Sequence, residues 1–386
     1  MLKIYNSFSS KIEDFEPFDP PVVKIFICGP TLYDYTHLGH ARIFLTYDLL
    51  CRFLKTRGYK TDVLVNMTDI NQSVFNKAIV QGINYHTLAQ FYSNEFIKDL
   101  DLLNIKTIAR FAHVSDYVKN ISKHISSLIE KRNAYSANGN IYFDTKTIKD
   151  YGKLSKQSRK QLNLHRMDIG PNKKNQEDFM LWNCSEDFGF SWKGDFGKGV
   201  PWWHIQDSSV AIENFGLHYD VHGGADELAY PHHEAHLAQY KAMTDLETPV
   251  KIWMHVSLVL SKGEKISKSR GNVVLARDLV SKYGQNLLRL YLFSTHYRKE
   301  IDYNEKNLLR NKSFLKKIQQ TYLRALHKTS EDISALIQEF YASLGNDLNS
   351  PKALNFLEKI CTKALKNSNI SIEDFTRIMD TLGLRV

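Results

Sequence analysis

The amino-acid sequence predicts an α/β fold, with a parallel sheet in its first part and helices towards its C-terminus. A strand-like apolar run at 24–28 leads through a loop into a helical pattern and then into a second strand-like run at 61–65. Further strand-like runs occur at 217–221 and 252–260. A strand–helix–strand unit is the building block of a parallel sheet with right-handed crossovers.

Short sequence features mark the elements of the first strand–helix–strand unit. Gly29-Pro30 closes the strand at 24–28, because neither residue favours continued pairing. The helix expected from Leu38 carries apolar residues at a spacing of three to four, namely Ile43, Phe44, Tyr47, Leu50, Phe53 and Leu54. A second helical pattern starts near Ser73, after the run at 61–65.

The segment 107–200 is expected to be an insertion between two halves of the sheet. It contains a helical pattern at about 114–132, a hairpin turn at Asn138-Gly139 and a Lys/Asn-rich stretch at 155–177. Beyond about Asn304 the pattern is helical almost to the end. We therefore divide the chain into two halves of one catalytic domain, the insertion and a helical domain, at 1–106, 107–200, 201–303 and 304–386.

The amino-acid composition limits the classes of protein to which the chain could belong. With 386 residues, 43% of them apolar, the chain can bury a large core, which excludes a disordered or fibrous protein. The net charge of +9 favours a polyanionic partner, although a solvated lysine-rich surface is an equal alternative. Four scattered cysteines, no signal peptide and no long apolar run predict a cytoplasmic protein without disulfides or membrane spans.

Two histidines flank a glycine where the first helix is expected to begin: His37, Gly39 and His40. The amides and the positive dipole end of a helix N-terminus bind phosphate, and a glycine lets a purine or ribose approach the backbone. Histidines there can donate to phosphoryl oxygens. Taken alone, the motif fits two surface histidines equally well.

A second loop, after the strand at 252–260, places Lys265 and Lys268 around hydroxyl side chains. Lysine charges of this kind can clamp a triphosphate and release pyrophosphate later. A solvated basic turn is the alternative for this loop by itself. Its combination with the upstream histidine loop, across a parallel sheet, predicts a site for a nucleoside triphosphate.

These two loops resemble the HIGH and KMSKS signatures of class I aminoacyl-tRNA synthetases. Several other stretches resemble cysteinyl-tRNA synthetases in particular, over about residue 3 to at least 350: CGPTLY at 28–33, NMTDI at 66–70, WHI at 203–205, HGG at 222–224 and PHHE at 231–234. The resemblance implies a Rossmann-like, HUP-type catalytic domain. It also implies ATP with Mg²⁺, an aminoacyl-adenylate, and transfer of cysteine to tRNA.

The resemblance also implies roles for individual residues. Those expected at the ATP phosphates and the transferring region are His37, His40, Lys265 and Lys268. Those expected elsewhere around the nucleotide are Thr31, Gly39, His222, Gly224, Glu227, Ser267 and Ser269. Those expected at the amino acid are Gly29, Thr68 and Trp203. Glu227 stands where the family has aspartate, which extends the side chain by about one methylene.

Members of the resembling family hold zinc through Cys, Cys, His and Glu. The corresponding positions here are Cys28, Asp207, His232 and His236, so two of the ligand types differ. Thiolate, carboxylate and imidazole all bind zinc, and histidines four apart share one helix face. The alternative is a metal-free polar pocket that binds another substrate.

The resemblance implies a monomer that binds the acceptor end of tRNA. Its basic surface and the basic residues of the 155–177 stretch would attract RNA; these are Lys156, Arg159, Lys160, Arg166, Lys173 and Lys174. Because the chain is shorter than is usual in the family, a paralogue that passes the amino acid to a small-molecule amine, like mycothiol-type cysteine ligases, is the alternative. A non-enzymatic RNA-binding relic is disfavoured by the two intact loops.

Overall fold

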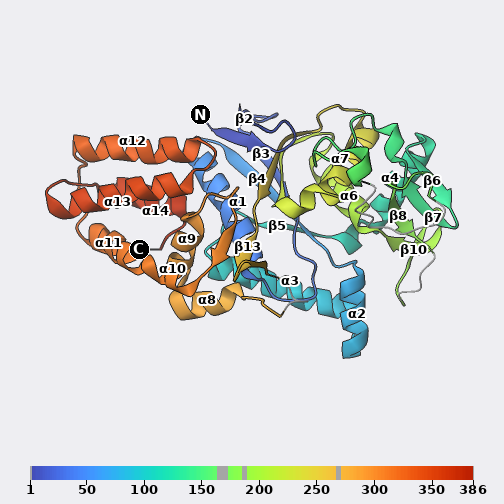
Figure 1. Cartoon of the computed structure of the whole chain (residues 1–386), viewed down its shortest axis with the longest axis horizontal. Helices are drawn as coiled ribbons and strands as arrows, with labels where there is room; N and C mark the ends of the chain where they lie inside the picture. The colour runs from blue at the N-terminus through green and yellow to red at the C-terminus, as the bar shows by residue number, and fades with distance from the viewer. Residues whose placement is uncertain (1, 163–172, 185–188, 267–270, 386) are drawn as a thin grey trace.

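The computed structural model describes residues 2–162, 173–184, 189–266 and 271–385. Its centre is a parallel sheet of five strands in the order β12-β11-β3-β4-β5 (Figure 1). These strands are β3 (Val22–Ile27), β4 (Lys60–Met67), β5 (Arg110–His113), β11 (Tyr219–Ala225) and β12 (Val250–Val256). The α/β fold predicted from the sequence is therefore confirmed.

Helix α1 (Leu38–Thr56) connects β3 to β4 and is the helix predicted from the apolar spacing. Its apolar side chains, among them Phe44, Leu45 and Phe53, are buried to 1% exposure or less. Helices α2 (Gln72–Gln81) and α3 (Tyr85–Leu102) then lead from β4 to β5. A short hairpin of β1 (Lys3–Asn6) and β2 (Lys11–Asp14) precedes the central sheet.

The insertion is a separate antiparallel sheet of five strands in the order β6-β7-β8-β10-β9. Its first two strands form the predicted hairpin around Asn138-Gly139, and α4 (Val118–Glu130) is the predicted helix, preceded by a 3-10 turn at Val114–Tyr117. The strands are β6 (Ala134–Ala137), β7 (Asn140–Phe143), β8 (Phe179–Asn183), β9 (Trp192–Gly194) and β10 (Gly197–Pro201), and a short helix α5 spans Arg159–Leu162.

Helices α6 (Trp203–Phe215) and α7 (His232–Thr244) lie between the central sheet and the insertion sheet (Figure 1). The run at 252–260, predicted as one strand, forms two: β12, and β13 (Val259–Ser261). At the break, the guanidinium of Arg42 donates to the carbonyl oxygens of Ser257 and Leu258 at 3.0 and 2.8 Å. Strand β13 instead pairs with β14 (Glu264–Lys265) and β15 (Ile301–Tyr303).

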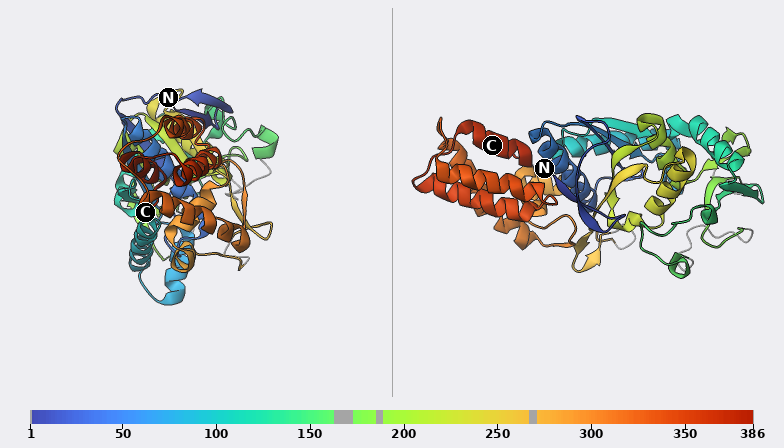
Figure 2. Two further views of the ribbon diagram at one scale, coloured as in Figure 1. Left: turned by 90° about the vertical axis from the view of Figure 1, so that its left-hand side faces the viewer. Right: turned by 90° about the horizontal axis from the view of Figure 1, so that it is seen from above.

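The C-terminal part is helical, as predicted, and forms one end of the molecule (Figure 2). The helices beyond Asn304 are α10 (Glu305–Arg310), α11 (Lys312–Leu323), α12 (Glu331–Gly345), α13 (Ser350–Lys366) and α14 (Ile372–Leu382). Two further helices, α8 (Ala276–Tyr283) and α9 (Gln285–Phe293), precede them in the range assigned to the second half of the catalytic domain. A fully buried ion pair between Arg289 and Asp48 joins α9 to α1. No helix among the described residues is long and apolar enough to span a membrane.

Candidate active site

A cavity of about 190 Å³ lies at the carboxyl ends of β3, β11 and β12, against the N-terminus of α1. This edge is where parallel α/β sheets bind their ligands. Seven of the residues predicted around the nucleotide and the amino acid line the cavity: Gly29, Thr31, His37, Gly39, His40, Glu227 and Lys265. Cys28 lines it as well.

His37 is the N-cap of α1. Its Nδ1 atom accepts hydrogen bonds from the amides of Gly39 at 3.1 Å and His40 at 3.3 Å. The rings of His37 and His40 stack with their centroids 3.7 Å apart. A Cβ atom at Gly39 would lie only 2.8 Å from His37 Cε1, so this capped turn requires glycine. The two imidazoles thus stand together at the positive end of the helix.

Lys265 and Glu227 form an ion pair on the other side of the same cavity. Both side chains are close to half exposed, so the pair is open to solvent and would be readily exchanged for a phosphate partner. The remaining predicted residues of this loop, Ser267, Lys268 and Ser269, lie outside the described residues.

His222 and Gly224, also predicted at the nucleotide, are not among the described residues that line this cavity. Both belong to β11, and the amide of Gly224 donates to the Tyr47 hydroxyl at 3.0 Å. That hydroxyl in turn donates to the Met254 carbonyl at 2.6 Å. Tyr47 therefore links α1 to β11 and β12 through hydrogen bonds. The apolar spacing of α1 did not predict this role.

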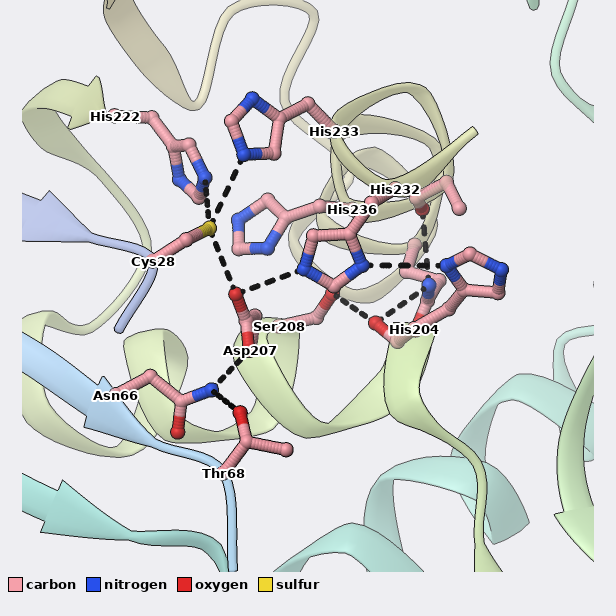
Figure 3. Close-up of polar contacts among 12 residues, drawn as sticks. Cys28, Asn66, Thr68, His204, Asp207, Ser208, His222, His232, His233 and His236 are labelled. Carbon is pink, nitrogen blue, oxygen red and sulfur yellow. Dashed lines mark hydrogen bonds and ion pairs between the residues drawn. The ribbon is translucent and has the colours of Figure 1, made fainter. Parts of the chain in front are cut away.

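Cys28, which lines the cavity, belongs to a largely buried group of side chains that could bind a metal ion (Figure 3). Cys28 Sγ lies 3.0 Å from Asp207 Oδ2, and His232 Nε2 lies 3.0 Å from the same oxygen. The three come from different elements: Cys28 follows β3, Asp207 is in α6, and His232 begins α7. Their ligand atoms all lie within 4.8 Å of one another, so they could hold one metal ion.

The fourth predicted ligand, His236, is buried beside this group but is not part of it. Its Nε2 atom lies 2.8 Å from the Tyr219 hydroxyl. Cys28 is instead approached by two other imidazoles: His233 Nε2 at 3.1 Å and His222 Nε2 at 3.5 Å. Cys28, His222 and His233 form a second set that could hold a metal ion. His233 was not predicted from the sequence as a possible ligand. Its position next to the predicted ligand His232 is the sequence feature that could have indicated it.

Burial governs the protonation states in this cluster. It raises the pKa of Cys28 well above its ordinary value, and the Asp207 charge adds to this. Burial would also raise the pKa of Asp207, but its contacts with His232 and Cys28 hold it below the ordinary value. Burial lowers the pKa of His222 and His233 strongly and that of His236 to about 3. The three imidazoles are therefore neutral at pH 7, the form that binds metals.

Neighbouring side chains orient the cluster. The Asn66 amide donates to Asp207 and, at 3.3 Å, to the Thr68 hydroxyl. The Trp203 indole stacks on His232, with ring centroids 4.5 Å apart and the planes within 1°. Thr68 and Trp203, both predicted at the amino acid, thus lie beside this group of possible metal ligands. Gly29 allows β3 to approach β4, because a Cβ atom there would lie 1.7 Å from the Asn66 carbonyl oxygen.

Sequence comparison identifies close relatives. Residues 14–313 match the family model for the catalytic domain of class I (C) tRNA synthetases. The cysteine–tRNA ligase of Wigglesworthia glossinidia brevipalpis is 37% identical over 380 residues, which cover 96% of this chain and 81% of the relative. The cysteine–tRNA ligase of Archaeoglobus fulgidus is 34% identical over 409 residues, which cover 99% and 87%.

Solved structures of class I synthetases share the fold. Methionyl-tRNA synthetase of Mycobacterium tuberculosis, in complex with methionyl-adenylate, has a TM-score of 0.66 at 14% identity and covers 94% of this chain and 88% of its own. The LeuRS of Agrobacterium radiobacter K84, in a ternary complex with tRNA and LeuAMS, has a TM-score of 0.69 at 12% identity and covers 96% and 84%. Since the family model spans most of the sequence and the relatives align nearly throughout, the chain belongs to the class I (C) family of tRNA synthetases.

Proposed function

We propose that this chain is a cysteine–tRNA ligase, which activates cysteine with ATP and transfers it to tRNA. The observation that supports this most directly is the position of Cys28. It lies in the wall of the cavity that His37 and His40 border, and it belongs to the buried group with Asp207 and His232. Side chains suited to a phosphate, His37 and His40, and a side chain suited to a thiol-binding metal, Cys28, therefore line the same cavity.

In the proposed first step, the cysteine carboxylate attacks the α-phosphate of ATP. A bond forms between the carboxylate oxygen and the α-phosphorus while the bond from that phosphorus to pyrophosphate breaks. In the transition state, negative charge is spread over the remaining oxygens of the α-phosphate. The imidazoles of His37 and His40 would hold those oxygens, at the positive end of the α1 dipole. Lys265 would leave Glu227 to contact the departing pyrophosphate, and we assign the same role to Lys268. Mg²⁺ would accompany the nucleotide.

Zinc fits the residues at Cys28, because a thiol, a carboxylate and an imidazole already converge there in a buried place. Cys28, Asp207 and His232 would hold the ion, with His233 or His236 as a fourth ligand. When bound, zinc supplies a position for the substrate thiolate. That contact would separate cysteine from serine better than pocket volume could, because oxygen and sulfur differ little in size.

The proposed acceptor is tRNA. A net charge of +9 favours a polyanionic partner, and exposed lysines of the insertion region, including Lys156 and Lys174, contribute to it. We also propose that residues 107–200 act as an insertion within one catalytic domain, apart from β5 (Arg110–His113), which pairs with β4 in the central sheet, and that 304–386 form a helical domain. Both parts would contact the RNA outside the catalytic cavity.

Transfer to tRNA can be tested with radiolabelled cysteine, ATP and purified tRNA. We expect label in acid-precipitable RNA, released by mild base because the linkage is an ester, and no label when ATP is omitted. Label attached to a small amine, with none in RNA, would contradict the tRNA part of the proposal and would favour the small-molecule paralogue. Binding of tRNA that weakens steeply with added salt is the expected companion result.

A further inference from the structure

A cavity of about 770 Å³ lies where the N-terminal strand β1, the end of α1 and the helices α12 and α14 meet (Figure 1). We propose that it binds a nucleoside diphosphate or triphosphate, as a second nucleotide site whose existence does not depend on the ligase function. The side chains that carry this inference are Lys3, Arg57, Gln338, Tyr341, Asn346 and Arg377.

This cavity lies at the opposite end of α1 from the catalytic one. His37 and His40, at the start of α1, line the catalytic cavity. Thr56 and Arg57, at the end of α1, line the second cavity. Helix α1 has 19 residues, which at 1.5 Å per residue separate its ends by about 28 Å. One nucleotide cannot reach both places, so a nucleotide bound here would be an additional one.

The charged side chains of the second cavity are positive. Lys3, Arg57 and Arg377 line it, and no aspartate or glutamate is among the described residues that do so. Lys3 pairs with Asp14 at 3.7 Å and Arg377 with Asp374 at 2.6 Å, both at the surface. Exposed ion pairs contribute little, so a phosphate can replace either carboxylate. Three cations around one cavity match a compact polyphosphate better than an RNA backbone, whose charges are spaced along the chain.

The helix ends at the second cavity limit where the phosphates can lie. Thr56 and Gly345 are the last residues of α1 and α12, and both line the cavity. The C-terminal end of a helix carries partial negative charge and carbonyl oxygens. The phosphates would therefore be held by the side-chain cations, whereas an exocyclic amine of the base could donate to a carbonyl oxygen.

The remaining walls suit a base. Tyr341 presents an aromatic ring, and the guanidinium carbons of Arg57 and Arg377 each lie 5.9 Å from its centroid. Aromatic rings and arginine planes both stack on bases. Gln338 and Asn346 add amide groups that can donate to and accept from the polar edge of a base. The volume lies within the range of about 300–1,000 Å³ that is typical of small-molecule sites.

Contacts within the fold hold the walls of the second cavity together. The Asp347 amide donates to the Lys3 carbonyl oxygen at 2.8 Å, and Asp347 Oδ1 accepts from the Tyr5 amide at 2.9 Å. These bonds join β1 to the end of α12. The Tyr341 hydroxyl lies 3.3 Å from Thr381 Oγ1 of α14. The cavity is therefore formed before a ligand binds, which lowers the cost of binding.

Equilibrium dialysis with radiolabelled ATP and Mg²⁺ tests this site. Arg57→Glu reverses a charge in the second cavity, whereas Lys55→Glu makes the same change at an exposed residue that does not line it. Arg57→Glu should bind about one ATP per chain fewer than the wild-type protein, because it places a negative charge beside the phosphates. Lys55→Glu should bind as much ATP as the wild-type protein. Equal binding by all three proteins would overturn the inference.

The difference between the variants isolates the second site from the catalytic one. Failure of the catalytic cavity to bind ATP would lower the stoichiometry of all three proteins equally and would count against the ligase function alone. Arg57→Lys should retain the site with an affinity within about tenfold of the wild-type value, because it keeps the charge but loses the planar fork.

Photolabelling with 8-azido-ATP gives the position of the bound nucleotide directly. The label should appear in the tryptic peptide that contains Tyr341, and Arg57→Glu should reduce this labelling at least about tenfold. Lys55→Glu should leave it unchanged. Added tRNA should not displace the label from this peptide. Displacement by tRNA would overturn the assignment to a free nucleotide, because the cavity would then belong to an RNA-binding surface.

Discussion

The Sγ atom of Cys28 lies 3.0 Å from Oδ2 of Asp207, so a thiol donates a hydrogen bond to a buried carboxylate beside the nucleotide cavity. Burial and the Asp207 charge keep the pKa of this thiol high, so a thiolate forms here only with a positive partner. A divalent cation bound between the two would replace the thiol proton and satisfy both groups. Metal content is therefore the first property to measure.

We expect the purified protein to bind one zinc ion per chain. Asp207→Asn and His232→Ala should each lower the zinc content below about half an equivalent after dialysis, because each removes one of few ligands. Elemental analysis of the dialysed proteins measures this. Zinc far below one equivalent in the wild-type protein, and unaltered in both variants, would mean that the pocket binds no metal.

The fourth ligand can be identified with a matched pair of variants. His233→Ala should lose more zinc than His236→Ala, because His233 Nε2 is 3.1 Å from Cys28 Sγ, whereas His236 Nε2 contacts the Tyr219 hydroxyl. Competition with a chromogenic chelator gives both affinities. The reverse order would support His236, the ligand predicted from the sequence.

The two histidines at the start of α1 should differ in their effects on stability. His40→Ala and His37→Ala should each slow pyrophosphate exchange by about 10²- to 10³-fold, as loss of a preorganised donor does. Only His37→Ala should also reduce the free energy of unfolding, by about 0.5–2 kcal/mol, because its Nδ1 atom caps the helix. Urea unfolding separates the two effects; equal stability of both variants would contradict the capping role.

The lysine loop offers its own internal control. Lys265→Ala and Lys268→Ala should each lower the rate of pyrophosphate exchange by about 10²-fold or more, because each removes charge from the proposed phosphate contacts. Lys262→Ala removes an exposed lysine that does not line the cavity and should stay within about twofold. Steady-state exchange at varied ATP measures this. Wild-type exchange in Lys268→Ala would contradict the proposed role of that lysine.

The buried imidazoles should make the metal-free protein sensitive to acid. Burial lowers the pKa of His236 to about 3 and that of His255 to about 4, whereas an unfolded histidine titrates near 6.5. Between these values the unfolded chain binds more protons than the folded one, so stability should fall as the pH drops below 6.5. Each histidine contributes up to about 1.4 kcal/mol per pH unit. Unfolding free energies in chelator should show this; a flat profile from pH 6.5 to 4.5 would refute it.

Short sequence patterns predicted those elements whose structure depends on neighbouring residues. The apolar spacing after Leu38 predicted α1, and the Asn138-Gly139 turn predicted the first hairpin of the insertion. The strands β8 to β10 were not predicted. Strand β8 pairs with β7 and β10, which are distant in sequence, and β9 and β10 form a hairpin of short glycine-containing runs that do not alternate clearly. At the break after β12, the chain is bound by Arg42, more than two hundred residues away in sequence.

The candidate site was likewise predicted only in part from the sequence. The resemblance to cysteinyl-tRNA synthetases implied a common ligand set of Cys28, Asp207, His232 and His236, and the first three of these do converge. The position of His222 beside Cys28 was not predicted, because its orientation depends on the Tyr219 hydroxyl, which lies 2.7 Å from its Nδ1 atom. Such side-chain orientation is a property of tertiary packing, which spacing along the sequence does not report.

The central claim is that this chain activates cysteine with ATP. The most direct measurement is ATP–pyrophosphate exchange with each of the twenty amino acids in turn, with and without tRNA. The account predicts rapid exchange with cysteine, little with serine, and loss of the preference for cysteine over serine in Asp207→Asn. Exchange with a different amino acid, or no amino-acid-dependent exchange at all, would contradict it.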